Sequence, residues 1–297
     1  MCRLLNIHLG ATFAFLYIPI AMLMVLSLNK AGLPTVWSGF SLEWYGKLAS
    51  NPKILFSAWN SIIVASASTL IATVLGTLLA LGVERAKPSP ARDALLFAPM
   101  IVPDIVLAIA LRSFFTLLKF SLGLHSIILA HVVFNIAFVA AVVRARLKSF
   151  DWSLVEVSRD LGATAFVTFW RITLPLIAPG IISALIFAFI VSFGDTYISL
   201  FLTGPGMTTL PIEIFSYMQW ESTPVVAAIT TVQILLILVL GLAVERLVGL
   251  RRIMRMHPDS RRRGMPPGRR TPKNQRCGAS GRSSHVVKAV LQSRPFV

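Results

Sequence analysis

The sequence alternates between long apolar stretches and short polar segments. Six of the apolar stretches are about 18 residues or longer, which is enough for a helix to cross a hydrocarbon core roughly 30 Å thick. They cover residues 11–28, 59–83, 94–118, 124–143, 180–202 and 224–244. We therefore expect an all-α polytopic membrane protein with six transmembrane helices, contained in a domain over residues 1–249.

Composition supports this class and argues against others. Of the 297 residues, 56% are hydrophobic and 13% are charged, whereas an average soluble domain carries about 25% charged residues. This excludes a disordered chain and argues against an ordinary soluble enzyme. The first apolar stretch is longer than the core of a signal peptide and is followed by no small-x-small cleavage site, so we expect it to remain as the first span.

Most of the net charge belongs to the C-terminal end. The chain carries +16, and residues 250–297 hold 13 Lys and Arg against the single acid Asp259. This segment is rich in Arg, Pro, Gly and Ser and has little to bury, which predicts a basic, disordered tail. Its expected partner is anionic membrane lipid, at on the order of 1 kcal/mol per basic residue near the surface. Nothing in it favours specific binding to nucleic acid, because no aromatic residues are interleaved with the basic ones.

The distribution of Lys and Arg between the loops predicts the orientation. With the N-terminus inside, the internal segments before the tail carry ten basic residues, namely Arg3, Arg85, Lys87, Arg92, Arg144, Arg146, Lys148, Arg159, Arg171 and Arg246. The external loops carry four, namely Lys30, Lys47, Lys53 and Lys119. Because basic residues collect on the cytoplasmic side, we expect both termini in the cytoplasm, an N-in/C-in topology.

Two loops are long enough to hold structure of their own. The external loop 29–58 contains Trp44, Tyr45 and Trp59, which suit a membrane interface. It is either a simple connector or the site of a short amphipathic helix. The internal loop 144–179 is far longer than two antiparallel helices need, which indicates a function on the cytoplasmic side.

The internal loop is typical of two short helices separated by a glycine. Ser153 and Glu156 have the spacing of a capping box at the start of the first helix, and Gly162 is placed to end it. Thr164 can cap a second short helix that runs through Trp170. Two prolines then precede the fifth span. We expect a compact amphipathic feature that faces the cytoplasm.

The same loop resembles a motif of a known family. Glu156-Val157-Ser158, three residues, Gly162, nine residues and then Ile172-Thr173-Leu174-Pro175 resemble the EAA loop (E-A-A-x3-G-x9-I-x-L-P) of the membrane subunits of binding-protein-dependent ABC importers. Val157-Ser158 stands where the pattern has Ala-Ala. The resemblance implies a type I importer permease fold and a coupling loop that docks into a cytosolic ABC ATPase dimer. The residues assigned to the coupling loop on this basis are Glu156, Val157, Ser158, Asp160, Gly162, Ile172, Leu174 and Pro175.

The resemblance extends from about Pro34 to Gly249. Segments such as PMIVPDIVLAIAL and FIVSFGDTYISLFLTGPG are similar to the second permease subunits of spermidine/putrescine importers. This implies transport of a small cationic solute across a bacterial inner membrane, with a second six-span permease and an extracytoplasmic solute-binding protein as partners. A permease for a different small solute is the alternative that the resemblance leaves open.

The sequence contains none of the motifs that would make it an enzyme. It has no G-x-x-x-x-G-K-[ST] loop to hold nucleotide phosphates, so ATP and Mg²⁺ are expected on the partner ATPase. It has no zinc or nucleophile motif, and Cys2 and Cys277 lie at opposite ends of the chain. No catalytic residue, metal site or bound cofactor is expected. His125 and His131 are interpreted as hydrogen-bonded interior residues of the fourth span.

Three charged residues lie inside the expected spans, and such residues are costly in a membrane and are often functional. They are Asp104, Arg112 and Asp195. Asp104 follows Pro103, which together with Pro99 is expected to kink the third span. All three are assigned to the translocation pathway or its gate, where the two acids are expected to meet a cation. The alternative is that Asp104 pairs with Arg112 and only stabilises the bundle.

The external loop 203–223 is expected to help attract a cation, since it carries Glu213 and Glu221 and no basic residue. Two other classes of protein remain as rivals. An ion-gradient-driven transporter would use intramembrane charges but usually shows an internal repeat, and none is visible. An intramembrane enzyme would need a nucleophile or metal constellation within the spans.

Overall fold

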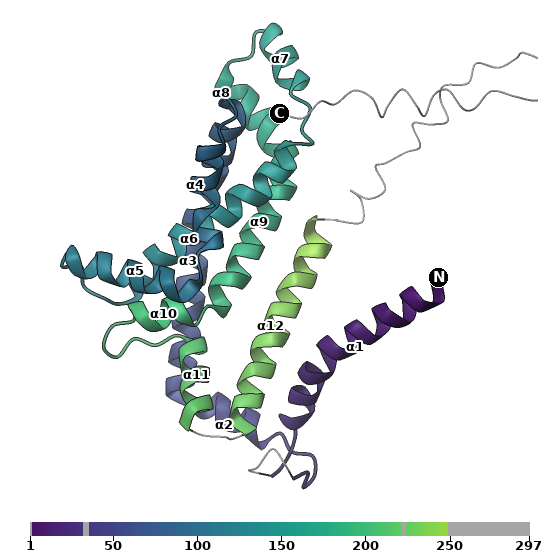
Figure 1. Ribbon diagram of the computed structural model, residues 1–297, viewed down its shortest axis with the longest axis vertical. Helices are drawn as coiled ribbons and strands as arrows, with labels where there is room; N and C mark the ends of the chain where they lie inside the picture. The colour runs from purple at the N-terminus through teal and green to yellow at the C-terminus, as the bar shows by residue number, and fades with distance from the viewer. Residues whose placement is uncertain (1, 32–35, 221–223, 249–297) are drawn as a thin grey trace, which may run out of the picture. The chain divides into compact units, whose positions relative to one another are not determined.

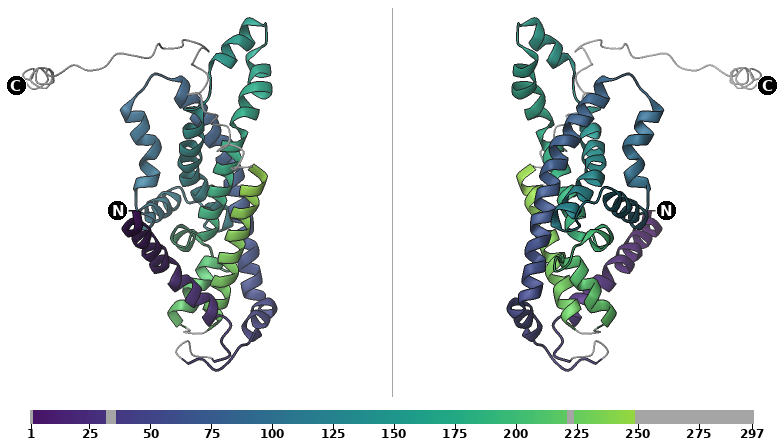
Figure 2. Two further views of the ribbon diagram at one scale, coloured as in Figure 1. Left: turned by 90° about the vertical axis from the view of Figure 1, so that its right-hand side faces the viewer. Right: turned by 90° about the vertical axis from the view of Figure 1, so that its left-hand side faces the viewer.

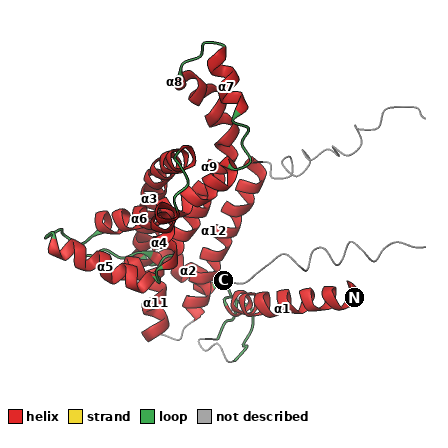
Figure 3. Ribbon diagram, turned by 45° about the horizontal axis from the view of Figure 1, so that its top comes forward, coloured by secondary structure: helices red, strands yellow, loops and turns green. Residues whose placement is uncertain are grey.

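The computed structural model describes residues 2–31, 36–220 and 224–248, and in these ranges it consists of helices joined by loops (Figure 1, Figure 3). The helices are α1 (Cys2–Leu26), α2 (Glu43–Ser50), α3 (Pro52–Arg85), α4 (Pro90–Ile101), α5 (Asp104–Leu117), α6 (Leu124–Leu147), α7 (Ser153–Asp160), α8 (Ala165–Thr168), α9 (Leu174–Gly194), α10 (Tyr197–Leu202), α11 (Leu210–Trp220) and α12 (Pro224–Val248). The basic tail and Glu221 lie outside the described residues.

The centre of the bundle is formed by α3, α6 and α9, which pack against one another (Figure 2). Small residues allow this close approach, as is usual between helices in a membrane. At Gly76 of α3, a Cβ atom would lie 2.8 Å from the Cβ of Val139 on α6. At Gly180 of α9, it would lie 2.8 Å from the Cβ of Arg146. A side chain at either glycine would force the helices apart.

The number of apolar helices agrees with a multi-span membrane protein. In the described part of the chain, five helices are long and apolar enough to cross a membrane, and six segments qualify if α4 and α5 together count as one span. The segments predicted inside and outside also lie apart. In Figure 1, α7 and α8 lie at one end of the bundle and α2 lies at the other.

The third predicted span, residues 94–118, is not one helix. The structure divides it into α4 and α5, which are bent by 100° relative to each other. The break falls at Val102 and Pro103. A residue before proline is pushed towards extended backbone, and Val102 has φ −68° and ψ 131°. The predicted kink is therefore a complete interruption at Pro103, whereas Pro99 is accommodated inside α4.

The fifth predicted span, residues 180–202, is also divided. Helix α9 starts earlier, at Leu174, and ends at Gly194, and α10 begins at Tyr197. Asp195 has φ −70° and ψ 127°, and its side chain accepts a hydrogen bond from the Ser199 N–H at 2.9 Å. Asp195 therefore lies between two helices and caps the second one, a position that short polar side chains favour.

The external loop carries the short helix that was one of its two interpretations. Helix α2 is held by its aromatic residues, because Trp44 Nε1 donates to the carbonyl of Asn29 at 2.8 Å and the Tyr45 hydroxyl lies 2.6 Å from Ser27 Oγ. Trp59 lies on α3 with 61% of its surface exposed. These aromatic rings suit the boundary between lipid and water.

Candidate functional site

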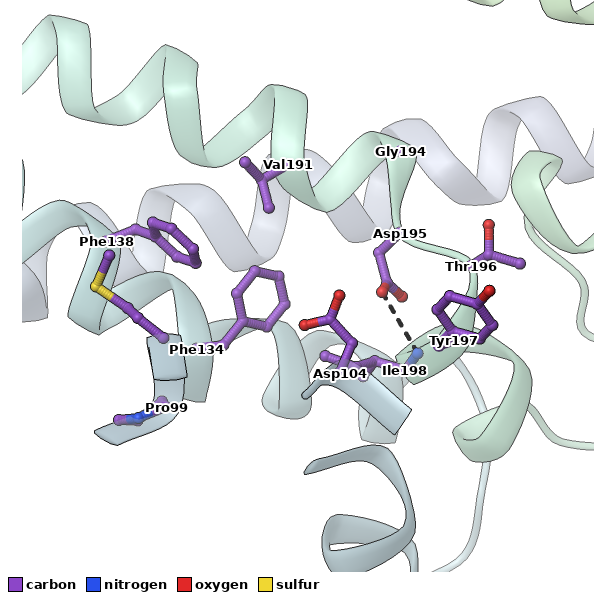
Figure 4. Close-up of a pocket in the computed structure, with 11 residues that line it drawn as sticks. Pro99, Asp104, Phe134, Phe138, Val191, Gly194, Asp195, Thr196, Tyr197 and Ile198 are labelled. Carbon is purple, nitrogen blue, oxygen red and sulfur yellow. Dashed lines mark hydrogen bonds between the residues drawn. The ribbon is translucent and has the colours of Figure 1, made fainter. Parts of the chain in front are cut away.

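A pocket of about 280 Å³ lies where both interruptions meet. It brings together Asp104, the first residue of α5, and Asp195, which follows α9 (Figure 4). Figure 4 shows both carboxylates directed into the same space. The remaining lining residues are mostly apolar or aromatic: Pro99, Met100, Phe134, Phe138, Val191, Gly194, Thr196, Tyr197 and Ile198. Carboxylates and aromatic faces are the groups that bind ammonium cations.

The two oxygens of Asp195 have different partners. Oδ2 accepts from the Ser199 N–H at 2.9 Å, lies 3.1 Å from Ser199 Oγ and lies 3.2 Å from His131 Nε2. Among the residues that the structure describes, Oδ1 accepts only the N–H of Ile198, at 3.4 Å. The side chain is 8% exposed. One oxygen is therefore fully used by the protein, and the other keeps most of its capacity to accept hydrogen bonds.

The expected alternative pairing of Asp104 with Arg112 does not occur. Arg112 Nη1 donates to the carbonyl of Phe201 at 3.0 Å, close to the end of α10. No ion pair to Asp104 is formed by the described residues. The two residues are eight positions apart on one helix, which is roughly 12 Å along the axis. Arg112 thus fastens α10 to α5 and lies outside the pocket lining.

His131 is the residue of this site that the sequence did not assign. It is fully buried on α6, as expected, but it also reaches Asp195, which is far away in the chain. Its other ring nitrogen, Nδ1, lies 2.6 Å from Ser192 Oγ. His125 differs from its prediction, since it is exposed and its Nε2 is bonded to the carbonyl of Ser121 at 2.7 Å. The apolar residues around the two histidines in the sequence do not show that His131 reaches Asp195 or that His125 is exposed.

Glu213 is not available to attract a cation. The predicted external loop 203–223 is largely helical, and Glu213 on α11 is 2% exposed and lies 3.0 Å from Lys53 Nζ. Glu213 is expected to be unpaired when only the basic residues of its own loop are counted. Its partner, Lys53, lies at the start of α3, and the sequence does not show that these two segments meet.

The segment between α6 and α9, which is predicted to be cytoplasmic, begins with α7 but not with the predicted capping box. The helix already includes Ser153, and the Ser153 N–H is accepted by Asp151 Oδ1 at 3.0 Å. The hydrogen bonds from Ser153 lower the pKa of the Asp151 carboxyl below its usual value. Glu156 lies one turn further on and is exposed, as is Asp160. Both acids are therefore directed to solvent.

Gly162 ends α7 as predicted. Its φ of +86° is in the left-handed region that favours glycine. The Ala163 N–H donates to the carbonyl of Ser158 at 3.1 Å, and the Gly162 N–H donates to that of Arg159 at 2.8 Å. These two bonds form a Schellman motif. Thr164 then caps α8 through the N–H of Val167, also as predicted.

The second short helix does not stop at Trp170. It continues through a π-helical turn, Phe169–Thr173, into α9. In this wider turn the Leu174 N–H bonds to the carbonyl of Phe169, and the next residue, Pro175, has no N–H and would crowd an ordinary α-helical turn. The π turn therefore lets the chain enter α9 without a break at Pro175.

The two halves of this segment enclose an apolar groove of about 660 Å³. Ser158 Oγ lies 3.0 Å from Thr168 Oγ1 and so joins α7 to α8. The groove is lined by Leu154, Val157, Ser158, Leu161, Ala163, Val167, Arg171, Ile172, Pro175 and Leu176. Of the residues in the predicted motif, Val157, Ser158, Ile172 and Pro175 line the groove. Glu156 and Asp160 do not.

Comparisons with known proteins agree with this architecture. The family model for the binding-protein-dependent transport system inner membrane component matches residues 72–252. The spermidine/putrescine transport system permease protein PotC of Escherichia coli (strain K12) is 37% identical over 235 residues, covering 78% of this chain and 89% of that protein. The putrescine transport system permease protein PotI of the same strain is 37% identical over 238 residues, covering 77% and 84%.

A solved structure shows the same fold. It is that of a bacterial ABC transporter involved in the import of the acidic polysaccharide alginate, with a TM-score of 0.67 and 18% identity, covering 84% of this chain and 96% of that chain. The family match covers the helices that carry the pocket and the segment from α7 to the start of α9. This chain therefore belongs to the family of binding-protein-dependent transport system inner membrane components.

Proposed function

We propose that this chain forms one half of the translocation pathway for a small cationic solute of the polyamine class. The observation that carries the proposal is the pocket in which Asp104 and Asp195 face a common space among aromatic rings. Carboxylates attract ammonium groups by charge, and aromatic faces add cation–π attraction. The relatives named for spermidine and putrescine transport support the same class of solute.

The proposal includes six spans with both termini in the cytoplasm. The bent pair α4 and α5 then makes up the third span. The excess of Lys and Arg in the segments between the second and third and between the fourth and fifth spans supports this orientation. The exposed faces of the outer helices are left for lipid and for a second permease subunit that completes the pathway.

The segment from α7 to the start of α9 is proposed as the docking site of the cytosolic ABC ATPase dimer, which binds ATP and Mg²⁺. Its apolar groove is flanked by exposed side chains, with Leu161 83%, Phe166 71% and Trp170 53% exposed. Glu156 and Asp160 offer acidic groups at the same end. An apolar surface of this kind is typical of a protein interface. The solute would be delivered by an extracytoplasmic binding protein.

The pathway is tested with the complex purified from its native membrane and placed in proteoliposomes with its binding protein. ATP-dependent uptake of spermidine and putrescine is expected, and Asp104→Asn and Asp195→Asn should each lower it by roughly tenfold, the scale of one lost charge-assisted contact. Glu43→Gln is the matched control, because Glu43 is an exposed acid on α2 that pairs with Lys47. Full uptake by both Asp variants, or no uptake of either polyamine by the intact complex, would contradict the proposal.

Docking is tested separately by copurification. The Glu156→Lys/Gly162→Asp double variant reverses one exposed charge and strains the end of α7, so it should lose the ATPase while it keeps the second permease. If the variant retains the ATPase at wild-type stoichiometry, the docking site lies elsewhere.

A further inference from the structure

Four polar side chains from different parts of the bundle form a continuous row that ends at the pocket. Ser68 Oγ on α3 lies 3.1 Å from Ser192 Oγ on α9, and Ser192 Oγ lies 2.6 Å from His131 Nδ1 on α6. His131 Nε2 lies 3.2 Å from Asp195 Oδ2. The His131 ring is fully buried, and the Phe134 ring packs against it edge-on at 5.4 Å between centroids.

The chemistry of the end member sets the direction of these bonds. An ionised carboxylate only accepts hydrogen bonds, so His131 Nε2 must carry the proton that faces Asp195. The other ring nitrogen, Nδ1, lies 2.6 Å from Ser192 Oγ, so the imidazole is held at both nitrogens with Nε2 directed at Asp195. Buried hydrogen-bonded rows of this kind fix side chains more firmly than single bonds.

This row decides which oxygen of Asp195 the protein uses. His131 Nε2 and the two donors of Ser199 all converge on Oδ2, whereas Oδ1 has a single long contact, with the N–H of Ile198. Without His131, Oδ2 would keep only the two donors of Ser199, and the carboxylate could shift about its terminal torsion, which has a broad energy minimum. The oxygen left for a solute would then be held less firmly in position.

We propose that His131 is a positioning residue for solute binding, which orients Asp195 so that Oδ1 meets the cation. The inference rests on the proposed role of Asp195 in the pathway. It assigns His131 no contact with the solute, because His131 is absent from the pocket lining. Ser192 holds the imidazole ring of His131 through its other nitrogen, Nδ1.

Two substitutions separate this role from simple core packing. Gln places an amide N–H near the position of the imidazole Nε2, so His131→Gln keeps a donor for Asp195. Asn reaches only about as far as Nδ1, so His131→Asn keeps a polar partner for Ser192 but loses the bond to Asp195. Both variants remove the ring and are polar, and a purely structural histidine would tolerate or reject them together.

The experiment measures the half-saturating spermidine concentration for uptake by the reconstituted complex, beside basal ATP hydrolysis and the melting temperature. His131→Asn is expected to raise the half-saturating concentration by roughly tenfold, as for one charge-assisted hydrogen bond. His131→Gln should restore an affinity near that of the wild type. His125→Asn, an exposed histidine on the same helix, is the matched control and should change nothing.

The outcomes distinguish the two proposals. If Asp195→Asn weakens spermidine binding while His131→Asn and His131→Gln behave alike, His131 is not a positioning residue and the pathway proposal stands. If Asp195→Asn itself has wild-type affinity, the role of Asp195 in the pathway is wrong, and the inference fails with it. A fall in melting temperature equal in both His131 variants, with unchanged affinity, would also overturn the inference.

Discussion

Lys53 at the start of α3 lies 3.0 Å from the carboxylate of Glu213 on α11. The two side chains differ in environment, since Glu213 is 2% exposed and Lys53 is 65% exposed. The pair therefore compensates a buried charge with a partner that reaches in from the surface. It joins two helices that are far apart in the chain.

This asymmetry predicts unequal effects of removing either partner. Lys53→Met leaves a buried carboxylate without a cation and should destabilise the protein by about 1 kcal/mol, at the low end for a buried charge because solvent screens Lys53. Glu213→Gln removes the buried charge itself and should destabilise the protein less than Lys53→Met does. In melting curves of the purified complex, the double variant should be more stable than Lys53→Met alone. Additive losses would mean that the two side chains do not interact.

Replacing Gly162 by any other residue should destabilise the end of α7. A Cβ atom at this position meets no other atom within 4 Å, so the penalty for Gly162→Ala comes only from φ +86°, at roughly 1 to 2 kcal/mol for a left-handed residue. The end of α7 should loosen, and less ATPase should copurify. Gly46→Ala is the matched control, because Gly46 lies inside α2, also with no atom within 4 Å. A change of equal size in Gly46→Ala would refute the explanation.

At Gly76 the available space, and not the backbone conformation, is expected to limit which residue is tolerated. A Cβ atom there would lie 2.8 Å from Val139 Cβ and 3.0 Å from the carbonyl oxygen of Ile136. Gly76→Ala should therefore lower the melting temperature, with about 1–3 kcal/mol of overpacking. Val139→Ala in the same chain should relieve part of the loss. Gly241→Ala on α12, where a Cβ atom meets nothing within 4 Å, should be neutral.

Arg144 on α6 is expected to hold α3, α4 and α6 together at one end of the bundle. Its Nη1 lies 3.1 Å from Asp93 Oδ1 on α4, and its Nε lies 3.7 Å from Glu84 Oε2 on α3. Because Arg144 is only 15% exposed, Arg144→Met should destabilise the bundle by about 1 to 3 kcal/mol. Arg92→Met, on the same end of α4, is a suitable comparison in melting experiments. Equal melting temperatures of Arg144→Met and the wild type would show that the ion pairs contribute nothing.

The sequence predicted most of the fold because its signals are local. Apolar length identified the spans, and Gly162 and Thr164 marked the end of α7 and the start of α8 through their own backbone preferences. The capping box failed because Asp151, two residues before Ser153, competes for the same N–H group. Propensity shows which residues can cap a helix but does not decide between neighbours.

The site was predicted in part, because three of its features depend on tertiary contacts. Asp104 and Asp195 were recognisable as charges within apolar segments. That they share a pocket, that Arg112 lies elsewhere, and that His131 reaches Asp195 all follow from how α5, α6 and α10 pack. Hydrophobic periodicity carries no information on such contacts between distant segments.

The two interruptions that create the pocket also determine its electrostatics. Helices α4 and α9 end beside it, and α5 and α10 begin beside it. The C-terminal end of a helix carries a partial charge of roughly −0.5 and the N-terminal end roughly +0.5, so these four ends largely cancel. What remains is the charge of the two carboxylates. A solute with one ammonium group would leave this charge half balanced, whereas a solute with two would neutralise it.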